Sequence, residues 1–326
     1  MIEPQAVHGT TVAALIASGA GALTAAGVAF GHGTSNAHDE ATWLVLWRLG
    51  IPLDSDLDEA VLADQAVDAG QQAGVAALFE ERIRTRKPAA YLTQEAWLQG
   101  VPFYVDERAI VPRSFIAEIL ADGSIDDWLS DKTHDVLDLC TGNGSLACLA
   151  AMAYPDVQVT GSDLSTDALA VARINVDRHE LQERVQLIES DGMANTPGPW
   201  DLILCNPPYV NAHSMTALPA EYLAEPQLAL AGGSDGMDFI KQLFSDAPSR
   251  MREHAILILE IGNERGKAAS KYSRSLPISR IRIACSRMRL GASLNSCLMK
   301  SMPSKPPSRA CRCSGSTPRR VTNRCC

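Results

Sequence analysis

Basic side chains are scarce over most of this sequence of 326 residues. Residues 1–264 carry 14 Lys and Arg against 38 Asp and Glu, a net charge of −24. Because the phosphates of nucleic acids are negative, we do not expect this part of the chain to bind them directly. The length allows a sizeable core and roughly two domains, so an enzyme of ordinary size is possible.

Acidic residues and histidine are absent from residues 265–326, which carry 15 Lys and Arg, 12 Ser and six of the nine Cys. The composition changes abruptly at Arg265, and a frame change in a GC-rich gene would produce such a change. The alternative is a genuine basic tail that binds the ribosome. We favour the frame change and expect an aberrant, disordered tail. Its cysteines, among them Cys311, Cys313, Cys325 and Cys326, lack the spacing of zinc ligands, so no metal site is expected.

We expect neither a disulfide framework nor a secretory leader in this chain. Cys140, Cys148 and Cys205 sit in apolar runs, which is typical of buried thiols in a reducing cytoplasm. Residues 10–30 are apolar, but no Lys or Arg precedes them and Gly and Thr interrupt them. We therefore expect a loosely amphipathic helix there, a cytoplasmic protein, and no membrane association.

The periodicity of apolar residues divides the chain. Residues 1–95 are predicted to form a helical domain, because apolar residues recur at helical spacing from Asp54 to Arg86. Residues 96–112 alternate apolar and polar, with Gly100 at an expected turn, and are predicted to form a hairpin linker. Residues 113–264 form the predicted third segment, before the tail of residues 265–326.

Strands alternate with helices from Asp135 onward, which predicts an α/β fold with a doubly wound, Rossmann-like parallel sheet. A frame change at Arg265 would remove strands at the carboxyl end of this sheet. The predicted strands are 135–140, 157–161, 185–188, 201–205 and 255–261, and the predicted helices are 145–153, 165–178, with Ser165 as its cap, and 235–252.

Glycines follow the first predicted strand, where the chain enters a helix. Gly142 and Gly144 permit a sharp turn and a close approach of the backbone to a ligand. Dinucleotide-binding folds use the same geometry, and Ala147 in place of their third glycine does not exclude them. Acids at the next two strand ends indicate an adenosine cofactor: Asp163 can accept from both ribose hydroxyls, and Asp191 from an adenine amino group.

Each of these residues also fits a plain turn or cap, since Asp and Gly favour both. Their shared position at the carboxyl ends of strands favours a ligand site instead. The candidate cofactor residues are Asp138, Cys140, Thr141, Gly142, Asn143, Gly144, Asp163, Asp191 and Asn206.

The segment Asn206-Pro207-Pro208-Tyr209 follows the fourth predicted strand. Its prolines fix φ and lack N–H groups, so the Pro207 carbonyl is stiffly held. The two N–H groups of an amide or exocyclic amine can donate to this carbonyl and to that of the Asn206 side chain. Such acceptors orient a weak nitrogen nucleophile and stabilise its developing charge. The segment therefore predicts an S-adenosylmethionine-dependent N-methyltransferase, with Asn206, Pro207 and Tyr209 catalytic and all four residues, Pro208 included, binding the substrate.

No general base of conventional type is evident, because His179 and His213 are expected on the surface. An Asn followed by two prolines is also an ordinary turn when it stands alone.

These residues resemble the glutamine N-methyltransferases that modify the Gly-Gly-Gln tripeptide of protein substrates, and most of all the members that act on the third protein of the large ribosomal subunit. The resemblance spans about residues 28–264, with FGHGTSNAHDEA, DLCTGNG, NPPYV and ILEIGN among its stretches. It implies that Cys140 to Gly144 and Asp163 bind S-adenosylmethionine, that Asn206 to Tyr209 bind the glutamine, and that the helical domain recognises a ribosomal protein.

Three alternatives stay open. Release-factor glutamine methyltransferases share the Asn-Pro-Pro-Tyr segment, but usually have Pro-Arg-Pro-x-Thr-Glu where this chain has residues 112–117, and Gly where it has Cys140. Adenine-amino methyltransferases use a related motif, and here only the basic tail could hold a nucleic acid. Finally, the family continues past Glu260 to Asn263 with two further strands, so a frame change would leave a truncated, inactive product.

Overall fold

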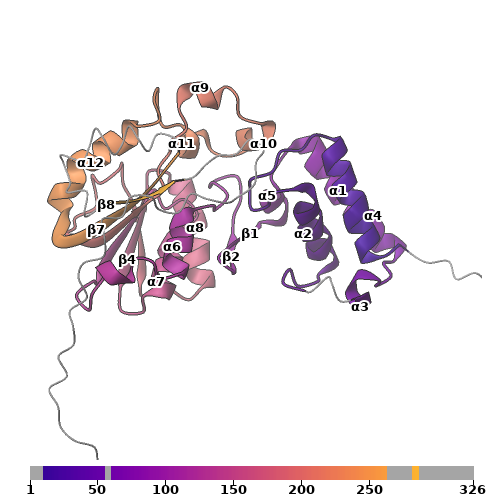
Figure 1. The fold of residues 1–326 in the computed structure, drawn as a ribbon, viewed down its shortest axis with the longest axis horizontal. Helices are drawn as coiled ribbons and strands as arrows, with labels where there is room; N and C mark the ends of the chain where they lie inside the picture. The colour runs from indigo at the N-terminus through magenta and orange to yellow at the C-terminus, as the bar shows by residue number, and fades with distance from the viewer. Residues whose placement is uncertain (1–9, 56–59, 263–280, 286–326) are drawn as a thin grey trace, which may run out of the picture. The chain divides into compact units, whose positions relative to one another are not determined.

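A parallel sheet of six strands, with helices packed around it, organises the part of the chain from α6 onward (Figure 1). The computed structural model describes residues 10–55, 60–262 and 281–285. The sheet confirms the predicted Rossmann-like, doubly wound α/β fold. Its strands, in spatial order, are β5 (Val185–Glu189), β4 (Gln158–Asp163), β3 (Asp135–Leu139), β6 (Trp200–Cys205), β7 (Met251–Ile261) and β8 (Ile281–Cys285).

Helices cover both faces of the sheet, so its central strands are apolar on both sides. Alternate residues of β3 enter different cores: Val136 packs on one face and Leu137 on the other. The first face is covered by α6 (Phe115–Ala121), α7 (Ser145–Ala153) and part of α8 (Thr166–Arg178). The second is covered by α12 (Asp238–Arg250). A 3-10 turn, Asp126–Trp128, precedes β3.

The strand order reverses between β3 and β6, and this reversal positions the site. From β3 the chain moves outward through β4 to β5, and then returns to pair β6 with β3 on its other side. The register aligns Leu139 with Cys205, so both strands end at the same level. Ligands of open α/β sheets bind in the crevice above such a switch point.

Two of the three predicted helices of the sheet domain begin where the sequence indicates, whereas α12 (Asp238–Arg250) is shorter at both ends than the predicted 235–252. α7 spans Ser145–Ala153, as predicted, and α8 begins after Ser165, whose side chain accepts a hydrogen bond from the N–H of Ala168 at 3.1 Å. Between β6 and α12 the chain forms three short helices that the periodicity did not predict, because each has only one turn. They are α9 (Ala212–Met215), α10 (Ala220–Leu223) and α11 (Gln227–Leu230).

The N-terminal part is helical, with an apolar core of its own. α4 begins at a capping box in which Asp68 and Gln71 bond each other's main-chain N–H groups. Residues 54–86 are therefore not one continuous helical run. No helix among the described residues has the length and apolar character needed to cross a membrane. The helices are α1 (Val12–Ala25), α2 (Ala37–Leu49), α3 (Ala60–Ala63), α4 (Ala69–Thr85) and α5 (Ala89–Thr93).

The predicted hairpin is present, with shorter strands than expected. β1 (Glu95–Leu98) pairs antiparallel with β2 (Val101–Tyr104). The turn consists of Gln99 and Gly100, which have φ values of 51° and 75°, the left-handed pair that suits a tight hairpin. Residues 105–112 continue without strand structure.

β8 lies within the segment 265–326 that the sequence assigns to an aberrant tail. It pairs parallel to β7, with Leu257 aligned to Ile281 and Ile261 to Cys285. Residues 281–285 thus add a sixth strand next to β7. The rest of the tail lies outside the described residues, and both its origin and the division into domains stay predictions.

Candidate active site

The glycine turn after β3 has the backbone conformation that its sequence requires. Gly142 and Gly144 have φ values of 55° and 79°. A Cβ on Gly144 would stand 2.9 Å from that of Ala172 on α8, so only glycine fits there. Cys140 is also left-handed, with φ of 61°, which is unusual for a residue with a side chain. Its thiol stays protonated, because a hydrogen bond with Cys205 and burial raise its pKa.

Asp138 lies beneath this turn and supports it. Its side chain is fully buried, and the hydroxyl of Thr141 donates to its Oδ2 at 2.5 Å. Burial raises the pKa of Asp138 to about 7. The carboxyl therefore holds Thr141 in place from the protein side of the loop.

Asp163, at the end of β4, joins two loops of the site. Its Oδ2 accepts the main-chain N–H of Gly142 at 2.9 Å, and its Oδ1 accepts that of Ser165 at 2.9 Å. Burial raises its pKa. Each carboxylate oxygen has a second lone pair, so ribose hydroxyls can still donate to it. Asp191 lies two residues beyond β5 and is exposed at the same edge, and its proposed contact with adenine stays a prediction.

Asn143 is turned into the protein. It is buried, its Oδ1 accepts from the N–H of Ser145 at 3.3 Å, and its Nδ2 donates to the carbonyl of Tyr104 at 3.4 Å. Asn175 on α8, which the sequence did not single out, also donates to Tyr104 and to the carbonyl of Asn143, at 2.9 Å and 2.8 Å. These two amides fasten the glycine turn to the hairpin. In the sequence, the sign of this role is that Asn175 lies on the apolar face of the predicted helix 165–178.

The Asn206 to Tyr209 segment begins directly beyond β6, one residue past the register pair that aligns with the end of β3. It therefore adjoins the glycine turn, as the methyltransferase hypothesis requires. The side-chain amide of Asn206 donates through Nδ2 to the carbonyl of Arg113 at 3.4 Å.

Three glycines pack closely against Tyr209 and the residues around it. A Cβ on Gly232 would stand 2.7 Å from the Cα of Tyr209, one on Gly236 2.4 Å from its carbonyl oxygen, and one on Gly262 3.2 Å from its ring. Val210 also bonds the backbone of residues 230 and 232, donating to the first at 2.9 Å and accepting from the second at 2.8 Å. The segment is thus stiff, through its prolines and through its surroundings.

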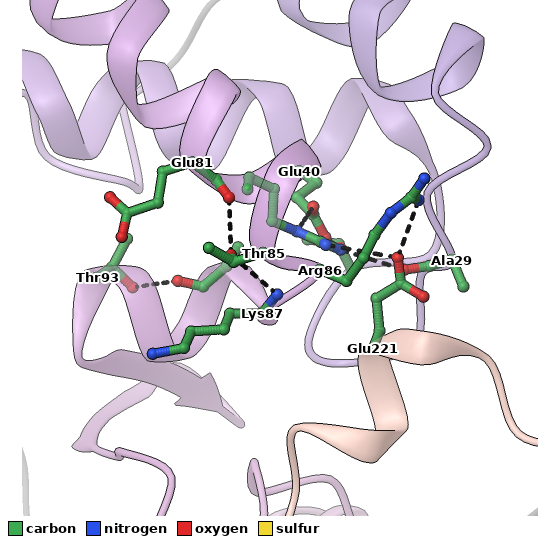
Figure 2. A network of polar contacts seen from close by, with 11 residues as sticks. Ala29, Glu40, Glu81, Thr85, Arg86, Lys87, Thr93 and Glu221 are labelled. Carbon is green, nitrogen blue, oxygen red and sulfur yellow. Dashed lines mark hydrogen bonds and ion pairs between the residues drawn. The ribbon is translucent and has the colours of Figure 1, made fainter.

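Two buried glutamates of residues 219–226 are held by arginines. Glu221 Oε1 lies 3.6 Å from Arg82 Nη1 and 3.4 Å from Arg86 Nη1, both of the helical part. Figure 2 shows Arg86 reaching Glu221, and Glu40 nearby, whose Oε1 accepts from Arg82 Nε at 2.8 Å. These contacts tie the chain that follows the Asn-Pro-Pro-Tyr segment to the N-terminal helices.

Glu225 accepts two hydrogen bonds from the Arg113 guanidinium, at 2.6 Å and 2.7 Å. Burial alone would raise the pKa of Glu225, but Arg113 and the neighbouring His32 lower it to about 2. Burial lowers the pKa of His32, whose Nε2 lies 3.3 Å from Glu225 Oε2. The carboxylate is therefore ionised and paired inside the protein.

Glu260 is a buried residue near the carboxyl end of β7. Its Oε2 accepts from the Ser114 hydroxyl at 2.5 Å and from the N–H of Phe115 at 3.0 Å. Burial raises its pKa to about 7. Of the two histidines expected on the surface, His213 is exposed, whereas His179 is half-buried and bonds the carbonyl of Pro102 at 3.0 Å.

Comparisons with known proteins find a family model, curated relatives and solved structures that resemble this chain. Residues 125–254 match the methyltransferase small domain family. A ribosomal protein uL3 glutamine methyltransferase of Burkholderia pseudomallei (strain K96243) is 47% identical, over 80% of this chain and 87% of its own length. One of Neisseria gonorrhoeae (strain ATCC 700825 / FA 1090) is 44% identical over 83% and 90%. The crystal structure of a ribosomal protein L11 methylase of Lactobacillus delbrueckii subsp. bulgaricus is similar at a TM-score of 0.34 and 20% identity, over 50% of this chain and 70% of that one.

The doubly wound sheet, the glycine turn and the matching domain define the class: the protein is a methyltransferase. Within that class, the chain belongs to the ribosomal protein uL3 glutamine methyltransferase family. Its cofactor is S-adenosylmethionine.

Proposed function

We propose that this chain methylates the side-chain amide nitrogen of a glutamine in ribosomal protein uL3. The observation that carries the proposal is the alignment of Leu139 with Cys205. It brings the glycine turn, which would hold the cofactor, against the segment that would hold the amide. The relatives' names supply the choice of uL3 over a release factor.

The residues of this chain act by binding and orienting the amide. The glutamine N–H groups donate to Asn206 Oδ1 and to the carbonyl of Pro207, which directs the nitrogen toward the cofactor. Bound S-adenosylmethionine supplies a methyl group that is electrophilic because its sulfur is positive. Transfer would form the N–C bond as the sulfur–methyl bond breaks, with S-adenosylhomocysteine as the leaving group. The two acceptors would stabilise the positive charge that the nitrogen then carries, and an N–H proton would pass to water.

Tyr209 is proposed to pack against the amide, while the cofactor is proposed to contact the backbone of Cys140 to Gly144 and the side chains of Asp163 and Asp191. Asp138 acts through Thr141. We assign recognition of the substrate protein to the helical residues 1–95.

The charge of the chain favours a protein substrate. A ribosomal protein must bind RNA and therefore carries basic patches, which complement the net charge of −24 over residues 1–264. The same charge disfavours an adenine in a nucleic acid. A ribosomal-protein substrate also places the reaction in the cytoplasm.

Mass spectrometry tests the proposal. The purified chain is incubated with uL3 and S-adenosylmethionine, and tryptic peptides are searched for a gain of about 14 Da on a glutamine. The Asn206→Ala variant serves as a matched control, which should bind the cofactor but transfer no methyl group. A release factor and an adenine-containing RNA are offered in parallel, and methylation of either instead of uL3 would refute the choice of substrate.

A further inference from the structure

The side-chain amide of Asn206 is asymmetric, and only one orientation suits the proposed reaction. If Oδ1 faces the substrate it accepts an N–H of the glutamine, whereas Nδ2 in that position would oppose it with a second donor. Asn206 Nδ2 donates to the main-chain carbonyl of Arg113 at 3.4 Å. This contact directs Nδ2 toward residue 113 and Oδ1 toward the other side.

The Arg113 carbonyl is itself fixed from one side by Glu225. The guanidinium of Arg113 makes a two-pronged contact with Glu225, at 2.6 Å and 2.7 Å. Glu225 Oε1 also accepts the main-chain N–H of Val111 at 3.0 Å. One buried carboxylate therefore holds both the side chain of residue 113 and the backbone two residues before it. A planar guanidinium gives this pair a defined geometry that a lysine would lack.

A second carboxyl fixes the chain on the other side of the carbonyl. Glu260 accepts from the hydroxyl of Ser114 and from the N–H of Phe115, at 2.5 Å and 3.0 Å. The peptide unit that presents the Arg113 carbonyl thus lies between two anchored points of the backbone. Glu225 and Glu260 reach it from distant parts of the chain, after β6 and at the end of β7.

We propose that Arg113 and Glu225 are positioning residues for methyl transfer: their ion pair fixes the Arg113 carbonyl, which orients the Asn206 amide so that Oδ1 receives the glutamine. This inference rests on the proposed function and adds to it the residues that determine the direction of the amide. It also accounts for an Asn, and not an Asp, at position 206. An ionised Asp would place one of its two acceptors against the Arg113 carbonyl, which can only accept.

Steady-state kinetics with uL3 test the pair. Arg113→Gln and Glu225→Gln should each lower kcat about tenfold or more, because misorientation of a binding group costs rate. The Kd for S-adenosylmethionine and the KM for uL3 should stay within about threefold of the wild type, because neither residue is a proposed cofactor contact and Glu225 meets the helical part at His32, which is itself buried. The control is Arg252→Gln, which should leave kcat unchanged. Arg252 pairs with Asp135 and Asp201 at the amino ends of β3 and β6, the edge of the sheet opposite to the site.

The Asn206→Asp variant gives a second, independent result. Its rate should be very low at neutral pH and should rise as the pH falls, because a protonated carboxyl can donate to the Arg113 carbonyl again. Unchanged kcat in a folded Arg113→Gln or Glu225→Gln protein would overturn the inference, and so would a fully active Asn206→Asp enzyme.

NMR separates failure of the inference from failure of the proposed function. In protein with 15N-labelled asparagine, the Asn206 NH2 protons should be protected from exchange in the wild type and lose that protection in Arg113→Gln, whatever the substrate. If Arg113→Gln does not fold, Glu225→Gln takes its place in this measurement. Equal exchange in wild type and variant would contradict the inference even if uL3 is methylated, whereas absence of uL3 methylation with the exchange difference intact would refute only the proposed substrate.

Discussion

Asp163 accepts a hydrogen bond from the main-chain N–H of Gly142 at 2.9 Å, and so connects the end of β4 to the turn that follows β3. Two loops that each look like an ordinary turn are thereby held in one arrangement. The carboxylate that would bind the ribose also sets the shape of the glycine turn. Cofactor affinity and loop structure consequently depend on the same side chain.

The Asp163→Ala substitution is expected to weaken binding of S-adenosylmethionine by tenfold or more. It removes the acceptor for the ribose and leaves the N–H groups of Gly142 and Ser165 without their partner, which should also destabilise the fold by about 1–3 kcal/mol. Calorimetric titration and urea unfolding measure the two effects. Asp167→Ala, at an exposed position in the first turn of α8, is the control and should lose only about 0.3–1 kcal/mol of stability. Unchanged affinity in Asp163→Ala would remove Asp163 from the cofactor site.

The Gly232→Ala substitution is expected to lower kcat with little effect on cofactor affinity. The new Cβ would stand 2.7 Å from the Cα of Tyr209 and 2.8 Å from the carbonyl oxygen of Pro208, so the Asn-Pro-Pro-Tyr segment must move. Initial rates and cofactor titration check this. Gly21→Ala, in α1, is the matched control, because a Cβ at this position would meet nothing within 4 Å. This substitution should stabilise the helix by about 0.5–1 kcal/mol. Equal rates for Gly232→Ala and wild type would show that the segment tolerates displacement.

The buried carboxyl of Glu260 should make stability depend on pH. Its pKa is raised from 4.5 to about 7 in the folded protein, so the stability it contributes is complete below pH 4.5 and is lost as the pH rises toward 7. The free energy of unfolding should fall by at most about 1.4 kcal/mol per pH unit from this group. Asp138, with a pKa raised to about 7, acts in the same direction.

Urea unfolding of Glu260→Gln between pH 4.5 and 7 should accordingly show a shallower decline than the wild type. The exposed Glu183→Gln variant should keep the wild-type slope. If Glu260→Gln and the wild type decline in parallel, folding does not raise the pKa of Glu260.

Truncation should reveal the contribution of β8. A chain that ends after residue 285 retains this strand, whereas a chain that ends after residue 264 exposes the edge of β7. We expect the shorter chain to be less stable by about 2 kcal/mol or more and to aggregate more readily, because five aligned residue pairs are lost. Urea unfolding and light scattering compare them. Equal stability would mean that the strand adds nothing to the sheet.

Sequence patterns predicted five of the six strands of the sheet, because the signals of those strands are local, and missed β8. Buried parallel strands such as β3 and β6 are short apolar runs with turn residues at their ends, and α7 lies between a glycine and an aromatic residue that mark its limits. β7 begins at Met251, earlier than the predicted start at residue 255. Arg252 to His254 are polar and exposed, so the apolar pattern did not include them in the strand. Its start is set by pairing with Trp200, which the sequence does not show.

The candidate site was predictable only in part. The glycine turn and the Asn-Pro-Pro-Tyr segment are contiguous motifs, and the predicted switch in strand order brings them together. The partners of Arg113 and Ser114 could not be predicted, because Glu225 and Glu260 lie 112 and 146 residues away from them in the chain. Isolated glutamates in a sequence are ordinarily surface residues, so nothing marked these two as buried. Only the folded chain shows which charges are paired inside.

The most direct test is a crystal structure of the protein with S-adenosylhomocysteine and a glutamine-containing peptide of uL3. We predict that the amide nitrogen lies about 2.9 Å from both Asn206 Oδ1 and the Pro207 carbonyl oxygen, with Asn206 Nδ2 on the carbonyl of Arg113. A glutamine bound elsewhere, or an amide that meets Asn206 through Nδ2, would contradict the account.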